Sequence, residues 1–353
     1  MKFTNLKHNI RFGLAAILAC TGSSAFFAQT ATERSPVAPS HEQVQTVINQ
    51  AYEKYKSDTG GKNADYIPAL AQVDPKLYGV VAISTDGQVV SDGDVDHPFS
   101  IQSISKVFSL ALAMNEMGAD QVFAKIGSEP TGRPFNSVEA VADMPSHTGN
   151  PFVNAGAIAT VSLIQAPTAD AKWEKILDFY SKAAGEKLSL LPDVYKSEAA
   201  TNTGNRALAA LLLKYERIYA DPLESVDVYT KQCSVGVTAK QLAVMGATLA
   251  NDGVNPITHE TVVKKENVPE ILATMTMDGL YDGSGRWAWH VGLPAKSGVG
   301  GGIIAVVPGK GAIAVFAPPL DEAGNSVKAQ KTIAYVADKL GMNLFSPVSV
   351  GLK

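Results

Sequence analysis

The sequence predicts an α/β (α+β) protein in which an antiparallel sheet is flanked by the N- and C-terminal helices and accompanied by a helical subdomain. Three patterns support this prediction. One β-hairpin pattern follows the first helical pattern, another precedes the last helical pattern, and Ala- and Leu-rich helical periodicity occupies the chain between them. Strands from the two ends of a chain commonly meet, so we expect both hairpins to share one sheet.

The elements follow in order along the chain. Residues 41–58 carry apolar side chains at helical spacing after Ser40, which we expect to cap the helix. Residues 77–94 have two β-rich arms around a Thr-Asp-Gly turn, which indicates a hairpin. Helical patterns then dominate residues 100–285, and a second hairpin pattern covers residues 301–319. Residues 326–342 are typical of an amphipathic helix that closes the fold.

We expect residues 41–353 to form the main domain, after a flexible linker at 29–40. Its α/β part would cover about 41–102 and 287–353, and its helical part about 103–286. A cleft between two such parts is a common place for a small-molecule site.

Residues 1–28 have the layout of a secretory signal peptide. Three basic residues precede a short apolar run, which is too brief to span a bilayer. The alternatives are a buried core helix and a lipoprotein processing site ending at Cys20. We therefore expect a periplasmic or secreted protein without a transmembrane helix in the mature chain.

Composition suits a well-cored globular protein, with 46% hydrophobic and 18% charged residues among 353. The net charge of −4 gives no reason to expect nucleic acid as a partner, and loss of the three basic signal residues would lower it to −7. Removal of Cys20 would leave Cys233 alone, and we expect this cysteine to be a small buried hydrophobe.

Ser103 and Lys106 begin a strongly apolar helical run. Residues three apart share one face of a helix, so the lysine amine would lie beside the serine hydroxyl. Serine needs a base within hydrogen-bond reach to act as a nucleophile, and a desolvated lysine can supply one. The simpler alternative is that Ser103 caps the helix and Lys106 is solvated.

A second motif, Lys296-Ser297-Gly298, precedes further glycines and a strand. Serine enzymes of the β-lactamase and penicillin-binding type pair Ser-x-x-Lys with Lys-Thr-Gly on a strand edge. Their Ser-Asp-Asn element is missing here, which favours the same scaffold with different chemistry. The alternative for the second motif is a glycine-rich hairpin entry.

The chain resembles the serine-dependent glutaminases, which have a β-lactamase-like fold. The resemblance runs from about residue 66 to residue 326 through seven segments: ADYIPAL, IQSISKVF, NPFVNAGAI, GNRALA, GLYDGSG, GLPAKSGVGGGI and PPLDEAGNSVK. It implies hydrolysis of L-glutamine to L-glutamate and ammonia through an acyl-enzyme. It also implies a homo-oligomer, either a dimer or a tetramer.

The resemblance assigns a role to each matching residue. Ser103 would be the nucleophile and Lys106 its base, and a protonated Lys106 or a tyrosine such as Tyr281 would protonate the leaving ammonia. Glu198 would bind the substrate ammonium, and Asn205 the carboxylate side. The backbone N–H of Val299 would stabilise the oxyanion together with that of Ser103. The other implied pocket residues are Tyr66, Asn154, Tyr229 and Tyr281.

No cofactor or metal is expected, since the six histidines include no ligand-spaced pair. Two rival functions stay open at this stage. One is a penicillin-recognising serine hydrolase, and the other is a glutamine-binding protein without turnover.

Overall fold

The computed structural model describes residues 39–346, which belong to a single compact unit. The predicted signal peptide at 1–28, Cys20 and almost all of the predicted linker at 29–40 lie outside the described residues. Within the described range, no helix has both the length and the apolar character required to cross a membrane.

The main sheet confirms the predicted meeting of the two hairpins. Its five antiparallel strands follow the order β2-β1-β8-β7-β6. The strands are β1 (Gly79–Ser84), β2 (Val89–Gly93), β6 (Ala295–Ser297), β7 (Gly302–Val307) and β8 (Gly311–Phe316). Pairing of β1 with β8, which places Val81 opposite Ala314, joins the two ends of the chain.

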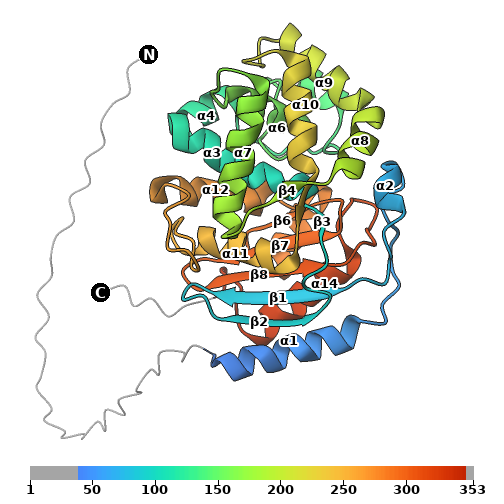
Figure 1. Ribbon diagram of the computed structural model, residues 1–353, viewed down its shortest axis with the longest axis vertical. Coiled ribbons are helices and arrows are strands. Elements are labelled where there is room, and N and C mark those ends of the chain that lie inside the picture. Colours follow the sequence, from blue (N-terminus) through green and yellow to red (C-terminus); the bar gives the residue numbers. More distant parts are fainter. Residues whose placement is uncertain (1–38, 347–353) are drawn as a thin grey trace, which may run out of the picture. The chain divides into compact units, whose positions relative to one another are not determined.

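Helices cover both faces of this sheet (Figure 1). On one face lie α1 (His41–Tyr55) and α14 (Val327–Lys339), which also pack against each other. Ser40 caps α1 as expected: its hydroxyl accepts the Gln43 N–H, and the Gln43 side chain accepts the Ser40 N–H. The first and last helices therefore take the predicted places.

The opposite face is covered by α11 (Ala239–Ala250), which contacts β1, β7 and β8. Alternating strand residues such as Val81, Ile304 and Ala314 point into this larger core. Helix α11 belongs to the stretch that we expected to form the helical subdomain. The helical region therefore supplies the helix that covers one face of the sheet. The division at residues 102 and 287 stays a prediction.

The remaining elements form the helical part, visible above the sheet in Figure 1. Its helices are α3 (Ser105–Met117), α4 (Ala119–Ile126), α5 (Val138–Asp143), α6 (Asn154–Leu163), α7 (Ala169–Ala184), α8 (Pro192–Thr201), α9 (Thr203–Lys214), α10 (Pro222–Cys233) and α12 (Val268–Asp278). Two further short helices are α2 (Pro68–Ala71), which contacts α8, and α13 (Ser284–His290), which contacts α12. A small sheet of order β3-β5-β4 joins β3 (Phe99–Ser100), β5 (Val235–Val237) and β4 (Ser189–Leu190).

Helix α3 runs through the middle of this helical part. Every residue from Ser105 to Met114 is buried, and the helix contacts α4, α6, α7 and α12. A helix that is buried on all sides must accommodate its polar residues internally, and one of these is Lys106. Cys233 is buried as well, in agreement with the prediction.

Candidate active site

Ser103 and Lys106 stand on consecutive pieces of helix. Ser103 lies in a 3₁₀ turn, Gln102–Ile104, and Lys106 follows in the first turn of α3. The Ile101 N–H donates to the Val235 carbonyl at 2.8 Å, which ties this turn to β5. Ser103 is buried, and Lys106 is only 1% exposed. The alternative of a solvated lysine behind a capping serine is therefore wrong.

The Lys106 amine is held by oxygen atoms of one segment. It donates to the Phe152 carbonyl at 3.0 Å and to Oδ1 of Asn154 at 2.7 Å. Burial lowers the pKa of Lys106 to about 8. Within residues 39–346, no hydrogen bond joins Lys106 to Ser103, so their expected contact stays a prediction.

Asn154 is the centre of the polar network around this amine. Its Oδ1 also accepts the Tyr229 hydroxyl at 3.0 Å, and its Nδ2 donates to Oδ1 of Asn205 at 3.0 Å. These contacts draw together α3, α6, α9 and α10. Asn205 takes part in this contact through its oxygen, which leaves its own amide N–H groups unused by it.

Glu198 approaches the same site from α8. Burial raises the pKa of its carboxyl to about 7, against the opposing effect of the Gln102 amide, which donates to Oε2 at 3.1 Å. Gln102 itself has a φ of 49°, an uncommon conformation for a residue other than glycine. Sequence reasoning missed Gln102, although it lies directly before Ser103 within the IQSISKVF segment.

Tyr281 lies at the edge of the site. Its backbone φ of 51° is an unfavourable conformation for a residue other than glycine. Its hydroxyl donates to the Ser297 carbonyl at 3.3 Å, and its ring packs against that of Phe135, with centroids 4.6 Å apart and the ring planes tilted by 36°. Burial raises the pKa of Tyr281, and its interaction with the Ser103 side chain lowers it. The Tyr281 hydroxyl is thus a neighbour of the predicted nucleophile. The Phe135 contact was not foreseen from the sequence.

The glycine-rich turn after β6 packs backbone to backbone against the segment that carries Ser103. A Cβ atom on Gly298 would lie 2.7 Å from the Ile101 carbonyl oxygen, and one on Gly300 would lie 2.3 Å from that of Ser100. Glycine is required at both positions because any side chain would push the turn away. Val299 lies between them, and its N–H makes no hydrogen bond within the described residues.

Tyr66 lies further out than the other predicted site residues, at 55% exposure. Its neighbours Ala64 and Ile67 belong to a small apolar cluster with Tyr281 and Val299. Tyr66 therefore stands at the rim of the site. Asn205 is half-buried. The other seven predicted residues are buried: Ser103, Lys106, Asn154, Glu198, Tyr229, Tyr281 and Val299.

Comparison with known proteins decides the family. The family model described as glutaminase matches residues 61–345. A glutaminase of Colwellia psychrerythraea is 54% identical over 308 residues, which cover 87% of this chain and 99% of that relative. The chain belongs to the glutaminase family.

Solved structures agree with this assignment. A probable glutaminase, 51% identical, matches with a TM-score of 0.86 over 88% of this chain and 100% of the other. A Bacillus subtilis glutaminase, 32% identical, matches with a TM-score of 0.78 over 86% of this chain and 99% of the other. That glutaminase was solved as a covalent complex with 5-oxo-L-norleucine, formed by reaction with 6-diazo-5-oxo-L-norleucine. The predicted family and its β-lactamase-like fold are confirmed.

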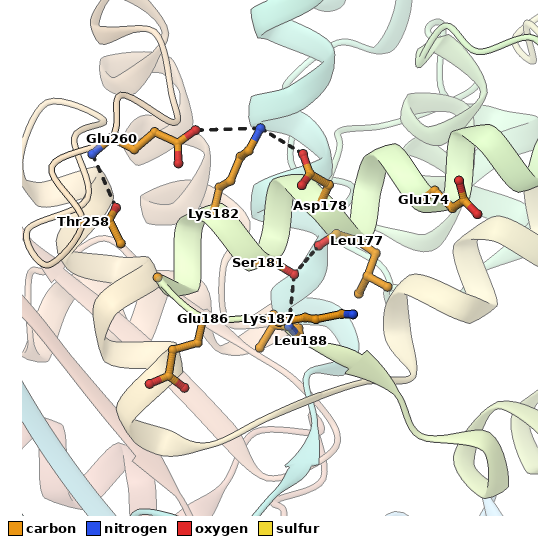
Figure 2. A pocket seen from close by; sticks show the side chains of 11 residues that line it. Glu174, Leu177, Asp178, Ser181, Lys182, Glu186, Lys187, Leu188, Thr258 and Glu260 are labelled. Carbon is orange, nitrogen blue, oxygen red and sulfur yellow. Dashed lines mark hydrogen bonds and ion pairs between the residues drawn. The ribbon is translucent and has the colours of Figure 1, made fainter.

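The largest cavity described in this glutaminase lies elsewhere. Its volume is about 460 Å³, and it opens beside the end of α7, where Figure 2 shows Lys182 between Asp178 and Glu260 at 3.0 and 3.8 Å. None of its lining residues belongs to the candidate site. A smaller cavity of about 170 Å³ borders the site instead, against Phe135, Phe152 and Tyr281. The largest described cavity is therefore not the one that borders the candidate active site.

The described residues offer no metal centre. Between residues 39 and 346, no group of three His, Cys, Asp or Glu side chains is arranged to hold an ion. The polar groups of the site are instead one amine, one carboxyl, amides and hydroxyls. Such a set can bind a zwitterion and transfer protons.

Proposed function

We propose that this protein hydrolyses L-glutamine to L-glutamate and ammonia, with Ser103 as the nucleophile and Lys106 as its base. The observation that carries the proposal is the buried Lys106 amine, one helical turn from Ser103, with its pKa lowered to about 8. An amine with this pKa is partly neutral near pH 7, whereas an ordinary lysine is almost fully protonated.

The hydrogen bonds of Lys106 support its role as a base. A neutral amine has two N–H groups and one lone pair. The Phe152 carbonyl and Asn154 Oδ1 accept the two N–H groups, which leaves the lone pair for the Ser103 hydroxyl. Catalytic hydrogen bonds often tighten only when substrate is bound, so the contact would complete itself in the complex.

In the reaction, Ser103 Oγ attacks the side-chain amide carbon of glutamine while its proton passes to Lys106. The oxyanion is stabilised by the N–H groups of Ser103 and Val299. Collapse of this intermediate breaks the C–N bond, and a proton from Lys106 or the Tyr281 hydroxyl leaves with ammonia. Water then hydrolyses the γ-glutamyl ester and releases glutamate.

Substrate recognition follows from the remaining polar groups. The Glu198 carboxylate would pair with the ammonium of glutamine, and the free N–H groups of Asn205 would donate to its carboxylate. Tyr66 at the rim and Tyr229 inside would bound the pocket. Asn154 would contact substrate, and its hydrogen bonds to Lys106 and Asn205 would orient both of these side chains.

The covalent complex of the Bacillus subtilis glutaminase supports a nucleophilic mechanism. Its ligand comes from 6-diazo-5-oxo-L-norleucine, a reactive diazoketone in which a diazo-bearing carbon stands in the place of the amide nitrogen of glutamine. Reaction of a family member with such an analogue is what an enzyme-bound nucleophile would produce.

The test is ammonia release by purified protein with glutamine, and with asparagine as the control substrate. Ser103→Ala and Lys106→Ala should each lower turnover by about 10³-fold or more while the fold is kept. Ser105→Ala is the matched control. The hydroxyl of this neighbouring buried serine makes only a 4.0 Å contact with Cys233, and the Tyr180 hydroxyl binds its backbone carbonyl, which alanine keeps, so the variant should remain active.

Other outcomes would contradict the proposal. Full activity of either variant would exclude the serine–lysine mechanism. A rise in melting temperature with glutamine but no ammonia would indicate a binding protein, and hydrolysis of a chromogenic β-lactam would indicate the penicillin-recognising alternative.

We further propose that the protein is exported to the periplasm or secreted, and that it forms a homo-oligomer. The supports are the basic and apolar pattern of residues 1–28 and the resemblance to the family. Mass mapping of the mature N-terminus tests export, including attachment at Cys20. Light scattering of the purified protein tests the oligomer.

A further inference from the structure

A second fully buried lysine lies beside the site, and the proposed mechanism does not use it. Lys296 begins the Lys296-Ser297-Gly298 motif and is 0% exposed. Its amine is turned toward backbone, donating to the Gly279 carbonyl at 2.9 Å and to the Ser297 carbonyl at 2.8 Å. With both contacts made inside the protein, the amine is not directed at a ligand.

The Gly279 carbonyl is the point where the end of α12 is fastened to β6. Besides the Lys296 amine, it accepts the Ser297 N–H at 3.1 Å and the Ser297 hydroxyl at 3.3 Å. Gly279 lies so close to β6 that a Cβ atom would be 1.6 Å from the Ala295 carbonyl oxygen. The chain leaves this junction and reaches Tyr281 only two residues later.

Lys296 also contacts the ring of that tyrosine. Its Nζ lies 4.2 Å from the Tyr281 ring centroid, within the range of a cation–π contact for a charged amine and of an N–H contact with the ring for a neutral one. The Tyr281 hydroxyl, at the far end of the ring, reaches the Ser297 carbonyl and neighbours Ser103. The Lys296 amine thus contacts both the Gly279 and Ser297 carbonyls, which lie beside Tyr281, and the ring of Tyr281.

Tyr281 needs such support because its backbone conformation is unfavourable. A non-glycine residue at a φ of 51° persists only where its surroundings hold it. A methionine of similar length could fill the space of Lys296 without the cost of burying an amine. What Lys296 adds over such an apolar side chain is its two hydrogen bonds, to the Gly279 and Ser297 carbonyls.

We propose that Lys296 is a positioning residue that holds Tyr281 against Ser103, acting through the Gly279 and Ser297 carbonyls and the tyrosine ring. This inference rests on the proposed function, since it assigns Tyr281 a part in the reaction at Ser103. Lys296 itself would contact neither substrate nor the reacting atoms.

The first experiment compares Lys296→Met with wild type in the ammonia assay. The expected result is a kcat at least about tenfold lower, with KM changed less than about twofold, because Glu198 and Asn205 still bind substrate. The midpoints of the pH profile should stay in place, since Lys106 and Glu198 are unaltered. Lys296→Gln, which restores a donor for one carbonyl, should have an intermediate kcat.

The matched control is Lys328→Met. Lys328 is also buried, donates to the Lys56 carbonyl at 3.4 Å and lies 4.9 Å from the ring centroid of Tyr78, but it sits away from the site. The Lys328→Met variant should have a changed melting temperature and an unchanged kcat. If Lys328→Met lowers kcat as much as Lys296→Met, the effect of Lys296 is general destabilisation and the proposal fails.

A double-mutant cycle with Tyr281→Phe separates positioning from any independent effect. If Lys296 acts through the Tyr281 hydroxyl, Lys296→Met should lower the residual kcat of Tyr281→Phe by less than about twofold. Equal losses in both backgrounds would overturn the proposal, as would an unchanged kcat in Lys296→Met. Should Lys296→Met fail to fold, the same cycle with Lys296→Gln decides. Absence of ammonia from wild type would instead contradict the proposed function.

Discussion

Two ionisable side chains of the site have pKa values displaced toward neutrality from opposite directions. Burial lowers that of Lys106 to about 8 and raises that of Glu198 to about 7. One cause produces both shifts because desolvation disfavours charge of either sign. In the proposed mechanism Lys106 acts in its neutral form, whereas Glu198 must be ionised to bind the substrate ammonium.

We therefore expect kcat/KM for glutamine to rise with pH. Both groups act after losing a proton, so the profile should climb between pH 6 and pH 9, with a slope approaching two below pH 7 on logarithmic axes. These two groups contribute no descending limb in that range. Initial rates at low substrate across this pH range check the expectation, and a flat profile would contradict it.

Glu198→Gln isolates one of these two protons. Loss of the carboxylate should raise KM by about 10- to 100-fold, the cost of removing one charge-assisted contact, while kcat changes less. The slope of the profile below pH 7 should fall from two toward one, because only Lys106 then titrates. An unchanged KM would show that Glu198 does not bind the ammonium.

At the scale of elements, the sequence predicts α1, α14 and both hairpins because their signals are local. A cap such as Ser40, apolar residues at a fixed period and a Gly-containing turn specify each element without reference to the rest of the chain. The direction of the Lys106 amine toward Phe152, the role of Gln102 and the contacts of Lys296 were not predicted. They depend on which segments meet after folding.

The packing of α11 on the sheet also depends on one small residue. A Cβ atom on Gly246 would lie 2.6 Å from Cδ1 of Ile304 and 2.7 Å from Cβ of Ala312. We expect Gly246→Ala to lower the free energy of unfolding by about 1–3 kcal/mol through overpacking. Denaturant titration measures the change.

Gly285→Ala is the control for this prediction. Gly285 lies in α13, and no atom would come within 4 Å of an added Cβ. Alanine there should be neutral or stabilise by up to about 1 kcal/mol, because it restricts the unfolded chain. Equal stability of the two variants would show that α11 does not pack closely on β7 and β8.

At the scale of the whole molecule, the candidate site gathers residues from Tyr66 to Val299, with Ser103 from the start of the helical part and Val299 from the glycine-rich turn between β6 and β7 of the sheet. Residue patterns alone singled out only the Ser103–Lys106 pair and the Lys296 motif. The other site residues came from the resemblance to the family, because an isolated Glu, Asn or Tyr carries no local signal of its role. Folding makes them neighbours, and spacing along the chain does not.

Burial of Lys106 should lower the free energy of unfolding of the protein. The pKa of Lys106 falls from 10.5 to about 8 on folding, which corresponds to about 3 kcal/mol of lost stability wherever both states would bind the proton. Lys106→Met removes this cost, although it leaves the Phe152 carbonyl and Asn154 without their donor. We expect the variant, although inactive, to unfold at pH 7 at a temperature at least equal to that of wild type.

The pH dependence of that difference has a definite sign. Between pH 8 and 10.5 the unfolded chain binds one more proton at Lys106 than the folded protein, so wild type gains stability as pH rises through this window. The advantage of Lys106→Met should therefore be largest at or below pH 8 and shrink toward pH 10. Paired thermal unfolding at each pH measures it, with Lys214→Met at an exposed position as the control. A difference that does not vary from pH 7 to pH 10 would mean that Lys106 keeps its ordinary pKa, and the base proposed for Ser103 would then be protonated at neutral pH.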